Sequence, residues 1–165
     1  MKEIDDKNAV SVALTAEHRW LDARFDIFQA QLALGQVSGH IFQEAAQILH
    51  RHIYLEEEVL FPELEACGLM GPTAVMAQEH GRICQALGEI LNLIGENAVP
   101  AKIQTTFRGL RSLLEEHDFK EEHVLYPSAD QLLAEASLKN VLRQLHEANP
   151  PEDWTCRAHR GASCC

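Results

Sequence analysis

Apolar residues recur at alternating spacings of four and three along most of this chain, a period that predicts helices rather than strands. Four such stretches cover residues 14–32, 41–59, 76–94 and 103–124. Turn residues separate them at Gly35 with Ser38-Gly39, at residues 67–72, and from Gly95 to Pro100. Four helices of similar length joined by short connections predict an all-α, up-down-up-down four-helix bundle.

The spacing also predicts which side chain faces the interior at each turn of each helix. The four expected stripes are Leu14, His18, Leu21, Phe25, Phe28 and Leu32; Ile41, Ala45, Ile48, His52, Leu55 and Val59; Met76, His80, Ile83, Leu87, Ile90 and Ile94; and Ile103, Phe107, Leu110, Leu114, His117, Glu121 and Val124. Ser38 and Thr73 are candidate N-caps. Pro62 and Pro127 are expected to end or kink the second and fourth helices.

The region after the fourth helix has a weaker amphipathic pattern over residues 129–148 and predicts a short fifth helix outside the bundle. Its expected inward residues are Leu133, Leu138, Val141, Leu142 and Leu145. We therefore divide the chain into a bundle with its fifth helix, residues 1–148, and a cysteine-containing C-terminal tail, residues 149–165.

Each predicted stripe contains a histidine where the period calls for an apolar residue, and two stripes also contain a glutamate. Burying a carboxylate costs several kcal/mol unless it is paired or bound to a metal. A single core histidine usually bonds to a neighbour, and a metal-free network of His and Glu is the alternative explanation here. Four histidines, one on each helix, favour a common cause.

Two of these positions lie in a sequence repeat. His52-Ile-Tyr-Leu-Glu56 with its ending Val-Leu-Phe-Pro62 returns as His117-Asp-Phe-Lys-Glu121 with the ending Val-Leu-Tyr-Pro127. Residues four apart stack on one helix face, so each copy presents an imidazole beside a carboxylate, which is a metal-ligand pair. The Glu-His pairs at 17–18 and 79–80 repeat in the same way. A pseudo-twofold pairing of two helical hairpins would bring all these groups together.

The candidate ligand set points to a binuclear metal site. It comprises His18, His52, Glu56, His80, His117 and Glu121. Six protein ligands are too many for one tetrahedral zinc ion, but they suit two metals bridged by both carboxylates, each with two imidazoles. A set of imidazoles and carboxylates suits iron and, less specifically, manganese or zinc. An oxo or hydroxo bridge would leave room for a small exogenous ligand.

These residues, with the Glu-Glu-x-x-aromatic-Pro endings, resemble the hemerythrin-like HHE cation-binding domain over about residues 10–130. The resemblance implies a non-haem centre of two Fe ions that binds O2 or NO or takes part in iron handling. It also implies that the four histidines are terminal ligands and that Glu56 and Glu121 bridge. The nearest subgroup contains the di-iron proteins of iron–sulfur cluster repair and their relatives that bind nitric oxide. The repair proteins usually carry an N-terminal cysteine segment that this chain lacks.

Two related architectures differ from this pattern. Oxygen-carrying hemerythrins place a second histidine one turn after the third-helix histidine, where this chain has Cys84, and they end with an Asp rather than Glu121; simple oxygen carriage is therefore disfavoured. Cys84 is an extra ligand, a redox-active thiol near the site, or a small buried residue. Ferritin-like oxidases use Glu-x-x-His, and this chain has no Glu three residues before a His.

Charge and cysteine content limit the partners and the compartment. A formal net charge of −11 argues against nucleic-acid and anionic-membrane partners, which need basic patches. The first residues lack the apolar core of a signal peptide, and no apolar run is long enough to cross a bilayer. Five cysteines are an odd number, which disfavours a secreted disulfide framework. We therefore expect a cytoplasmic location.

Several other polar residues have weaker signals. His50 and His123 are expected at the surface, with His123 a candidate proton relay. Glu57, Glu58 and Glu122 are alternative ligands if a helix is rotated or kinked. The tail contains Cys156, His159, Cys164 and Cys165, which suggests metal delivery or redox chemistry, against the alternative of an unstructured terminus.

Three functions are compatible with this sequence. The first is a di-iron protein that binds O2 or NO in sensing, scavenging or the response to nitrosative or oxidative stress. The second is a di-iron enzyme or iron donor that acts in NO or peroxide reduction or in iron–sulfur cluster repair. The third is a regulatory module that reports iron or oxygen to an unidentified protein partner.

Overall fold

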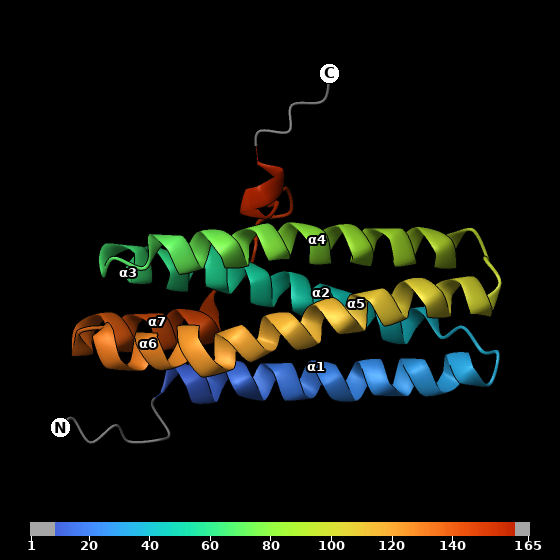
Figure 1. Cartoon of the computed structure of the whole chain (residues 1–165), viewed down its shortest axis with the longest axis horizontal. Coiled ribbons are helices and arrows are strands. Elements are labelled where there is room, and N and C mark those ends of the chain that lie inside the picture. The colour runs from blue at the N-terminus through green and yellow to red at the C-terminus, as the bar shows by residue number, and fades with distance from the viewer. Residues whose placement is uncertain (1–8, 161–165) are drawn as a thin grey trace.

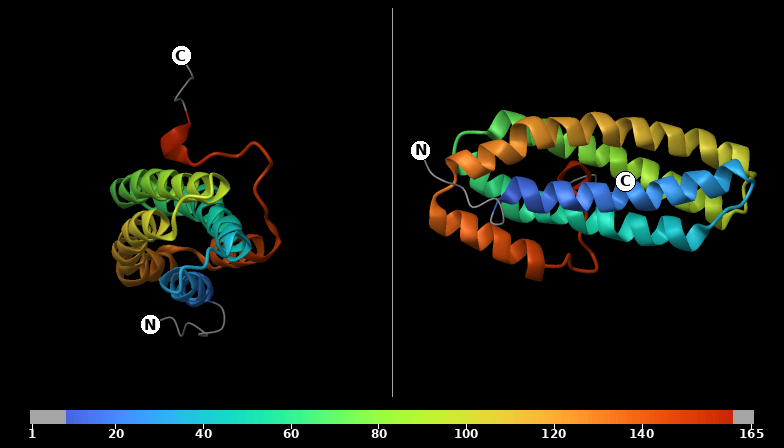
Figure 2. Two further views of the ribbon diagram at one scale, coloured as in Figure 1. Left: turned by 90° about the vertical axis from the view of Figure 1, so that its right-hand side faces the viewer. Right: turned by 90° about the horizontal axis from the view of Figure 1, so that it is seen from below.

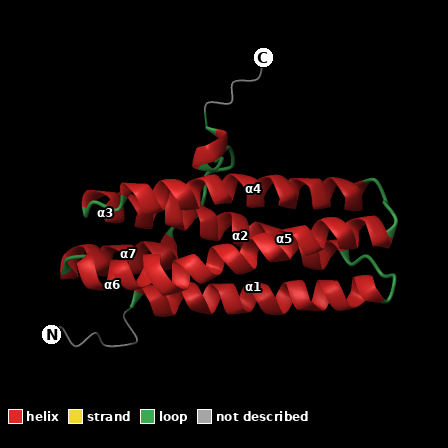
Figure 3. Ribbon diagram, in the orientation of Figure 1, coloured by secondary structure: helices red, strands yellow, loops and turns green. Residues whose placement is uncertain are grey.

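The computed structural model describes residues 9–160, which form helices and loops and contain no strand (Figure 3). Four long helices run side by side with alternating direction (Figure 1). They are α1 (Val10–Ala33), α2 (Gly39–Leu55), α4 (Met70–Gly95) and α5 (Pro100–Lys120). A fifth helix, α7 (Glu135–Glu147), packs on the outside. The predicted four-helix bundle with a short C-terminal helix is confirmed.

The second and fourth long helices each continue through a π-helical turn. These turns are η2 (Glu56–Leu60), followed by α3 (Phe61–Ala66), and η3 (Glu121–Leu125), followed by α6 (Tyr126–Leu132). Pro62 and Pro127 were expected to end or kink their helices; neither ends the helical backbone, but a π-helical turn interrupts the α-helix just before each proline. The wider turn places each proline in the first turn of the next α-helical segment, a position at which proline is tolerated. Single π-helical turns within α-helices are common at functional sites.

The π-helical turn also corrects part of the predicted stripe on the fourth helix. Val124 was expected inside but is 57% exposed, whereas Leu125 is buried. A π-helical turn holds more residues than an α-helical turn, so the inward position moves one residue along the chain. On α2 the buried residues include Phe42 and Leu49, while Ile41 and Ile48 are only half-buried, because α2 has neighbours on more than one side.

The predicted caps and the boundaries of the fifth helix also need correction. Ser38 occupies the N-cap position of α2 without a side-chain hydrogen bond. Thr73 lies inside α4, and its hydroxyl donates to carbonyl oxygens one turn earlier, so it is not a cap. The segment predicted as one helix from 129 to 148 begins in α6 and breaks at Leu133 before α7 starts.

After α7 the chain turns back across the bundle. This returning segment, which we define as residues 149–160, passes outside α2 and ends on α4 in the short 3-10 helix η4 (Arg157–His159) (Figure 2). Cys156 in this segment is buried, and Trp154 is half-buried. The segment therefore packs on the bundle rather than extending from it.

The interior consists of two apolar clusters along the bundle axis. One contains the four phenylalanines Phe25, Phe28, Phe42 and Phe107, with neighbouring rings 5.0–6.2 Å apart. The other surrounds Tyr126, Phe61 and Leu64 nearer the opposite end. Buried histidines and glutamates interrupt the stripes between these clusters. In residues 9–160 no helix is long and apolar enough to span a bilayer.

Candidate metal centre

All six side chains predicted as ligands lie inside the bundle and are at most 3% exposed. The long helices position the histidines, since each lies between apolar residues of its own stripe. Both glutamates are the first residue of a π-helical turn. The structure brings the six groups together between the two apolar clusters.

The side chains converge as two imidazole pairs. We call His18 and His52 the His18 half-site, and His80 and His117 the His80 half-site. In the first pair the two Nε2 atoms are 3.0 Å apart. In the second pair the ring centroids are 4.8 Å apart. Both histidines of each half-site come from one helical hairpin, α1 with α2 for the His18 half-site and α4 with α5 for the His80 half-site.

Both glutamates extend between the half-sites. Glu56 Oε1 lies 3.5 Å from His52 Nε2, and its Oε2 lies 3.2 Å from His80 Nε2. Glu121 Oε2 lies 3.4 Å from His18 Nε2, and its Oε1 lies 2.9 Å from His117 Nε2. Each carboxylate therefore offers one oxygen to each half-site, the arrangement that a bridging carboxylate needs.

Three atoms at this point lack a hydrogen bond within residues 9–160: Glu56 Oε2, Glu121 Oε1 and His80 Nε2. Leaving such buried groups unsatisfied costs about 1–3 kcal/mol each, and more for charged groups. Glu56, His80, His117 and Glu121 offer ligand atoms within 4.8 Å of one another, as do His18, His52 and Glu121. Two cations, one at each half-site, fit these donor atoms and would satisfy the unpartnered ones.

A second set of four carboxylates holds the outer nitrogens of the imidazoles. The Nδ1 atoms and their partners are His52 with Glu17 at 2.7 Å, His117 with Glu79 at 2.9 Å, His80 with Glu57 at 2.8 Å, and His18 with Glu122 at 2.9 Å. An Nδ1–H that donates to a carboxylate leaves the Nε2 lone pair free for a metal. The Nε2 atoms of all four histidines can therefore act as metal ligands.

Sequence reasoning did not find this outer set. Glu57 and Glu122 were considered as alternative ligands, but they contact the far side of the imidazoles. The available signal was adjacency: each of the four glutamates is next in sequence to a candidate ligand. Glu17 and Glu79 bond within their own hairpin, while Glu57 and Glu122 bond across hairpins, so the arrangement has the pseudo-twofold symmetry of the repeat.

Tyr126 is the other functional side chain that the sequence did not indicate. Its hydroxyl lies 2.5 Å from Glu56 Oε1, 2.9 Å from Glu121 Oε2 and 3.1 Å from His18 Nε2. The repeat aligns it with Phe61, whose ring stacks on His80 with centroids 5.6 Å apart and planes 7° apart. Of these two equivalent positions, only Tyr126 places a polar atom in the centre.

In the centre, the carboxylates raise the pKa of the imidazoles and the imidazoles lower the pKa of the carboxylates. Burial by itself would lower the pKa of His117, but Glu121 and Glu79 raise it to about 9. Burial and the adjacent Glu121 charge would raise the pKa of Glu56, yet His52 and His80 hold it at about 2. Without metal, protonated imidazoles therefore balance the carboxylates. Metal ions would supply the same positive charge after displacing those protons.

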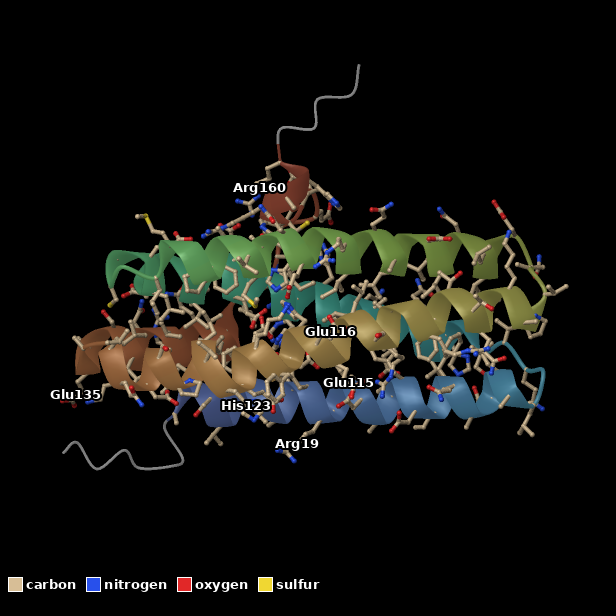
Figure 4. The ribbon with its side chains drawn as sticks, in the orientation of Figure 1. Arg19, Glu115, Glu116, His123, Glu135 and Arg160 are labelled. Atoms are coloured by element: carbon tan, nitrogen blue, oxygen red, sulfur yellow. The ribbon has the colours of Figure 1, made fainter. Side chains whose placement is uncertain are left out.

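The remaining predicted residues lie outside the centre. Cys84 is half-buried and is not among the side chains that converge on either half-site. His123 is exposed, as expected, and lies beside α1, far from Arg160 (Figure 4). His50 is half-buried against the Trp154 ring, 5.0 Å away. Cys164 and Cys165 lie outside the described residues.

A helical bundle that gathers histidines and carboxylates in its interior is a metal-binding domain. The sequence profile of the hemerythrin HHE cation-binding domain matches residues 10–148, which is most of the chain. The chain belongs to this family. A search of curated proteins found no match.

Proposed function

We propose that this protein holds two iron ions and uses them to bind O2 or NO in sensing, scavenging or the response to nitrosative or oxidative stress. His18 and His52 would hold one ion, His80 and His117 the other, and Glu56 and Glu121 would bridge them. The proposal includes an oxo or hydroxo bridge. The ions would supply positive charge and open coordination positions for the small ligand.

One observation supports two ions rather than one: each buried glutamate divides its oxygens between the half-sites. Glu56 Oε2, Glu121 Oε1 and His80 Nε2 lie within 2.9–3.2 Å of the opposing nitrogens or oxygens but form no hydrogen bond with them, which favours a cation over a closed network of hydrogen bonds. Six donors exceed the tetrahedral set of one zinc ion, and a set of imidazoles and carboxylates suits iron.

The surroundings of the His18 half-site suggest where a small ligand enters. Asp118 Oδ1 lies 3.8 Å from His18 Nε2, and Glu122 holds His18 Nδ1. Both residues also line a surface cavity of about 660 Å³. We infer that O2 or NO reaches the centre along this side.

Asp118 also favours the enzymatic alternative, a di-iron enzyme or iron donor that acts in NO or peroxide reduction or in iron–sulfur cluster repair. Reduction of NO or peroxide consumes protons. Asp118 lies 3.8 Å from His18 Nε2 and also lines the surface cavity, so its carboxyl can pass protons from solvent to the centre. Steady turnover with an electron donor would establish the enzyme, whereas stoichiometric binding alone would establish the binding protein.

Metal analysis tests the centre itself. Protein purified without added metal should contain two irons per chain. His52→Ala and Glu121→Ala should each lower iron content and thermal stability together, because metal binding is linked to folding. His123→Ala and Glu116→Ala are controls at exposed positions of the π-helical turn that contains Glu121 and of α5, which precedes it (Figure 4). Unchanged iron loading in both ligand variants would contradict the site assignment.

Optical titration tests the ligand. Addition of O2 or NO to the reduced iron protein should change its absorption spectrum, and Glu121→Ala should abolish that change. A spectrum indifferent to both gases, in protein that contains two irons, would exclude the proposed function while leaving the metal site intact.

The division of the chain and its location belong to the same proposal. We treat residues 1–148 as the metal-binding unit and residues 149–165 as an appended tail. The described cysteines Cys67, Cys84 and Cys156 are free thiols, which fits the reducing environment of a cytoplasm.

A further inference from the structure

Two cysteines from distant parts of the chain meet beside α4. Cys84 lies on α4 one turn after His80, and Cys156 lies in the returning segment just before η4. Cys156 is 2% exposed and belongs to the apolar cluster against which Cys84 packs. Each thiol shifts the pKa of the other, and the 3-10 helix that follows Cys156 packs on α4. Two free thiols placed in this way need little movement to form a covalent bond.

The surface of α4 is shaped to receive this segment. A Cβ atom at Gly81 would lie only 2.6 Å from Ala158 Cβ, so the close approach needs glycine. Trp154 packs edge-on against the rings of His50 and Tyr54 on α2, at 5.0 and 5.3 Å. These contacts hold Cys156 beside Cys84.

The electrostatics distinguish the two sulfurs. The hydrogen bond from Cys84 lowers the pKa of Cys156 to about 6 against the effect of burial, and His159 adds to this lowering. The same bond raises the pKa of Cys84. Cys156 is therefore the thiolate and the nucleophile of the pair. Cys84 lines a surface cavity of about 520 Å³ between α2 and α4, which brings a small oxidant to the edge of the pair, and opening of the returning segment would expose Cys156 to it.

We propose that Cys84 and Cys156 form a reversible dithiol site, which a hydroperoxide oxidises to an intramolecular disulfide that fixes the returning segment on α4. The Cys156 thiolate attacks one peroxide oxygen, the O–O bond breaks, and hydroxide leaves. Cys84 then attacks the resulting sulfenic sulfur, and the S–O bond breaks as hydroxide leaves. The two thiol protons convert both hydroxides to water, so one H2O2 gives one disulfide and two waters.

The position of this site connects it to the metal centre. Arg157, next to Cys156, donates its backbone N–H to Glu57 Oε2 at 2.6 Å. The other oxygen of Glu57 holds His80 Nδ1 at 2.8 Å. Arg157 also donates from its guanidinium to the Glu57 carbonyl oxygen at 2.7 Å. Fixing Cys156 therefore fixes the residue that orients His80.

Peptide mapping of the full-length protein, with its metal content as purified, tests the pairing. Trypsin separates Cys67, Cys84 and Cys156 into peptides 52–82, 83–102 and 144–157, and it leaves Cys164 and Cys165 in 161–165. After one equivalent of H2O2, non-reducing mass spectrometry should find peptides 83–102 and 144–157 linked, and a thiol reductant should separate them. Diamide, an iron-independent two-electron oxidant, should give the same link.

The outcomes separate the parts of the proposal. No link with either oxidant, or a dominant link from 144–157 to 161–165, would overturn the pairing. A link with diamide alone would overturn a hydroperoxide as the oxidant. Cys84→Ser and Cys156→Ser should each abolish the link, and Cys67→Ser, at an exposed position, should leave it unchanged.

Hydrogen exchange tests the effect on the returning segment. Amides of residues 154–160 should exchange at least about tenfold more slowly after oxidation, because the cross-link removes open states of the segment. Cys84→Ser protein treated with the same oxidant should show no slowing. Equal exchange in the reduced and oxidised wild-type protein would contradict the proposed fixing of the segment.

Discussion

The two half-sites arise from the same sequence repeat but have different surroundings. The His80 half-site is closed to solvent. Phe61 stacks on His80, and Glu57, which orients His80, is fully buried beneath the returning segment. The His18 half-site has the Tyr126 hydroxyl at its centre. Its orienting side chains, Glu17 and Glu122, are 29% and 27% exposed.

This difference indicates a division of roles between the halves. A buried, carboxylate-oriented imidazole is held rigidly, and water cannot replace its partner. A half-site with a polar hydroxyl, a nearby surface cavity and solvent-accessible carboxylates allows exchange of small molecules and protons. We infer that the His80 half-site mainly retains metal and that the His18 half-site mainly meets the ligand.

The largest effect is expected from the carboxylates that orient the imidazoles. Loss of such a partner typically lowers metal affinity about 10–100-fold. Glu57→Gln should lower the metal affinity about 100-fold, the upper end of this range. Its amide can donate to His80 Nδ1, which places the imidazole proton on Nε2, the nitrogen that should bind the metal. Glu122→Gln should stay near the lower limit, since water can reach His18. Competition with a chelator measures both, with Glu116→Gln as the control, and equal losses would remove the proposed difference between half-sites.

A smaller effect is expected from the central hydroxyl. Tyr126→Phe should destabilise the metal-free protein by about 1–3 kcal/mol, because the carboxylates of Glu56 and Glu121 lose a buried donor. The loss should shrink in metal-loaded protein, where cations satisfy those oxygens. Denaturant unfolding with and without metal measures the difference. The same loss in both states would show that the hydroxyl does not share partners with a metal.

The contact of the returning segment with the His80 half-site predicts a still smaller effect. Gly81→Ala should displace the segment, since the new Cβ would meet Ala158 at 2.6 Å, and tryptic cleavage after Arg157 in the native protein should become faster. Gly88→Ala, on the same helix with nothing within 4 Å, should instead stabilise the protein by about 0.5–1 kcal/mol through helix propensity. Similar proteolysis of both variants would show that the Gly81 contact does not hold the segment.

The last predicted effect is a pH dependence that only the metal-free protein should show. The folded-state pKa of His117 is raised from 6.5 to about 9. Its contribution to stability is therefore complete below pH 6.5 and is lost as the pH rises through 9. Glu79, whose pKa is lowered from 4.5 to about 2 mainly by the hydrogen bond with His117, contributes above pH 4.5 and loses that contribution as the pH falls through 2.

Unfolding of chelator-treated protein across pH 6–9 measures this loss. Metal-loaded protein should not show it, because its imidazoles bind as neutral ligands. His117→Gln should flatten the dependence in the metal-free protein. A rise in stability of the metal-free protein from pH 6.5 to 9 would contradict the assigned sign.

The sequence by itself determined the helices, the up-down-up-down bundle and the convergence of six side chains. Periodicity fixes which helix face is buried, and on α1 every predicted inward residue from Leu14 to Leu32 is buried. The spacing of His52 with Glu56 and of His117 with Glu121 places each pair on one face. The helical period and the spacing within each pair are local features, so the pattern along the chain contains them, and the convergence follows once all four faces pack inward.

Only the tertiary structure decided what surrounds those side chains. The carboxylate partners of His18 and His80 come from the opposite hairpin, and Tyr126 reaches the centre only because the π-helical turn at Glu121 advances its position. The returning segment places Cys156 beside Cys84, 72 residues apart in the chain. Contacts between residues so distant in sequence depend on how the helices and the C-terminal segment pack. The hydrophobic period along the chain does not specify that packing.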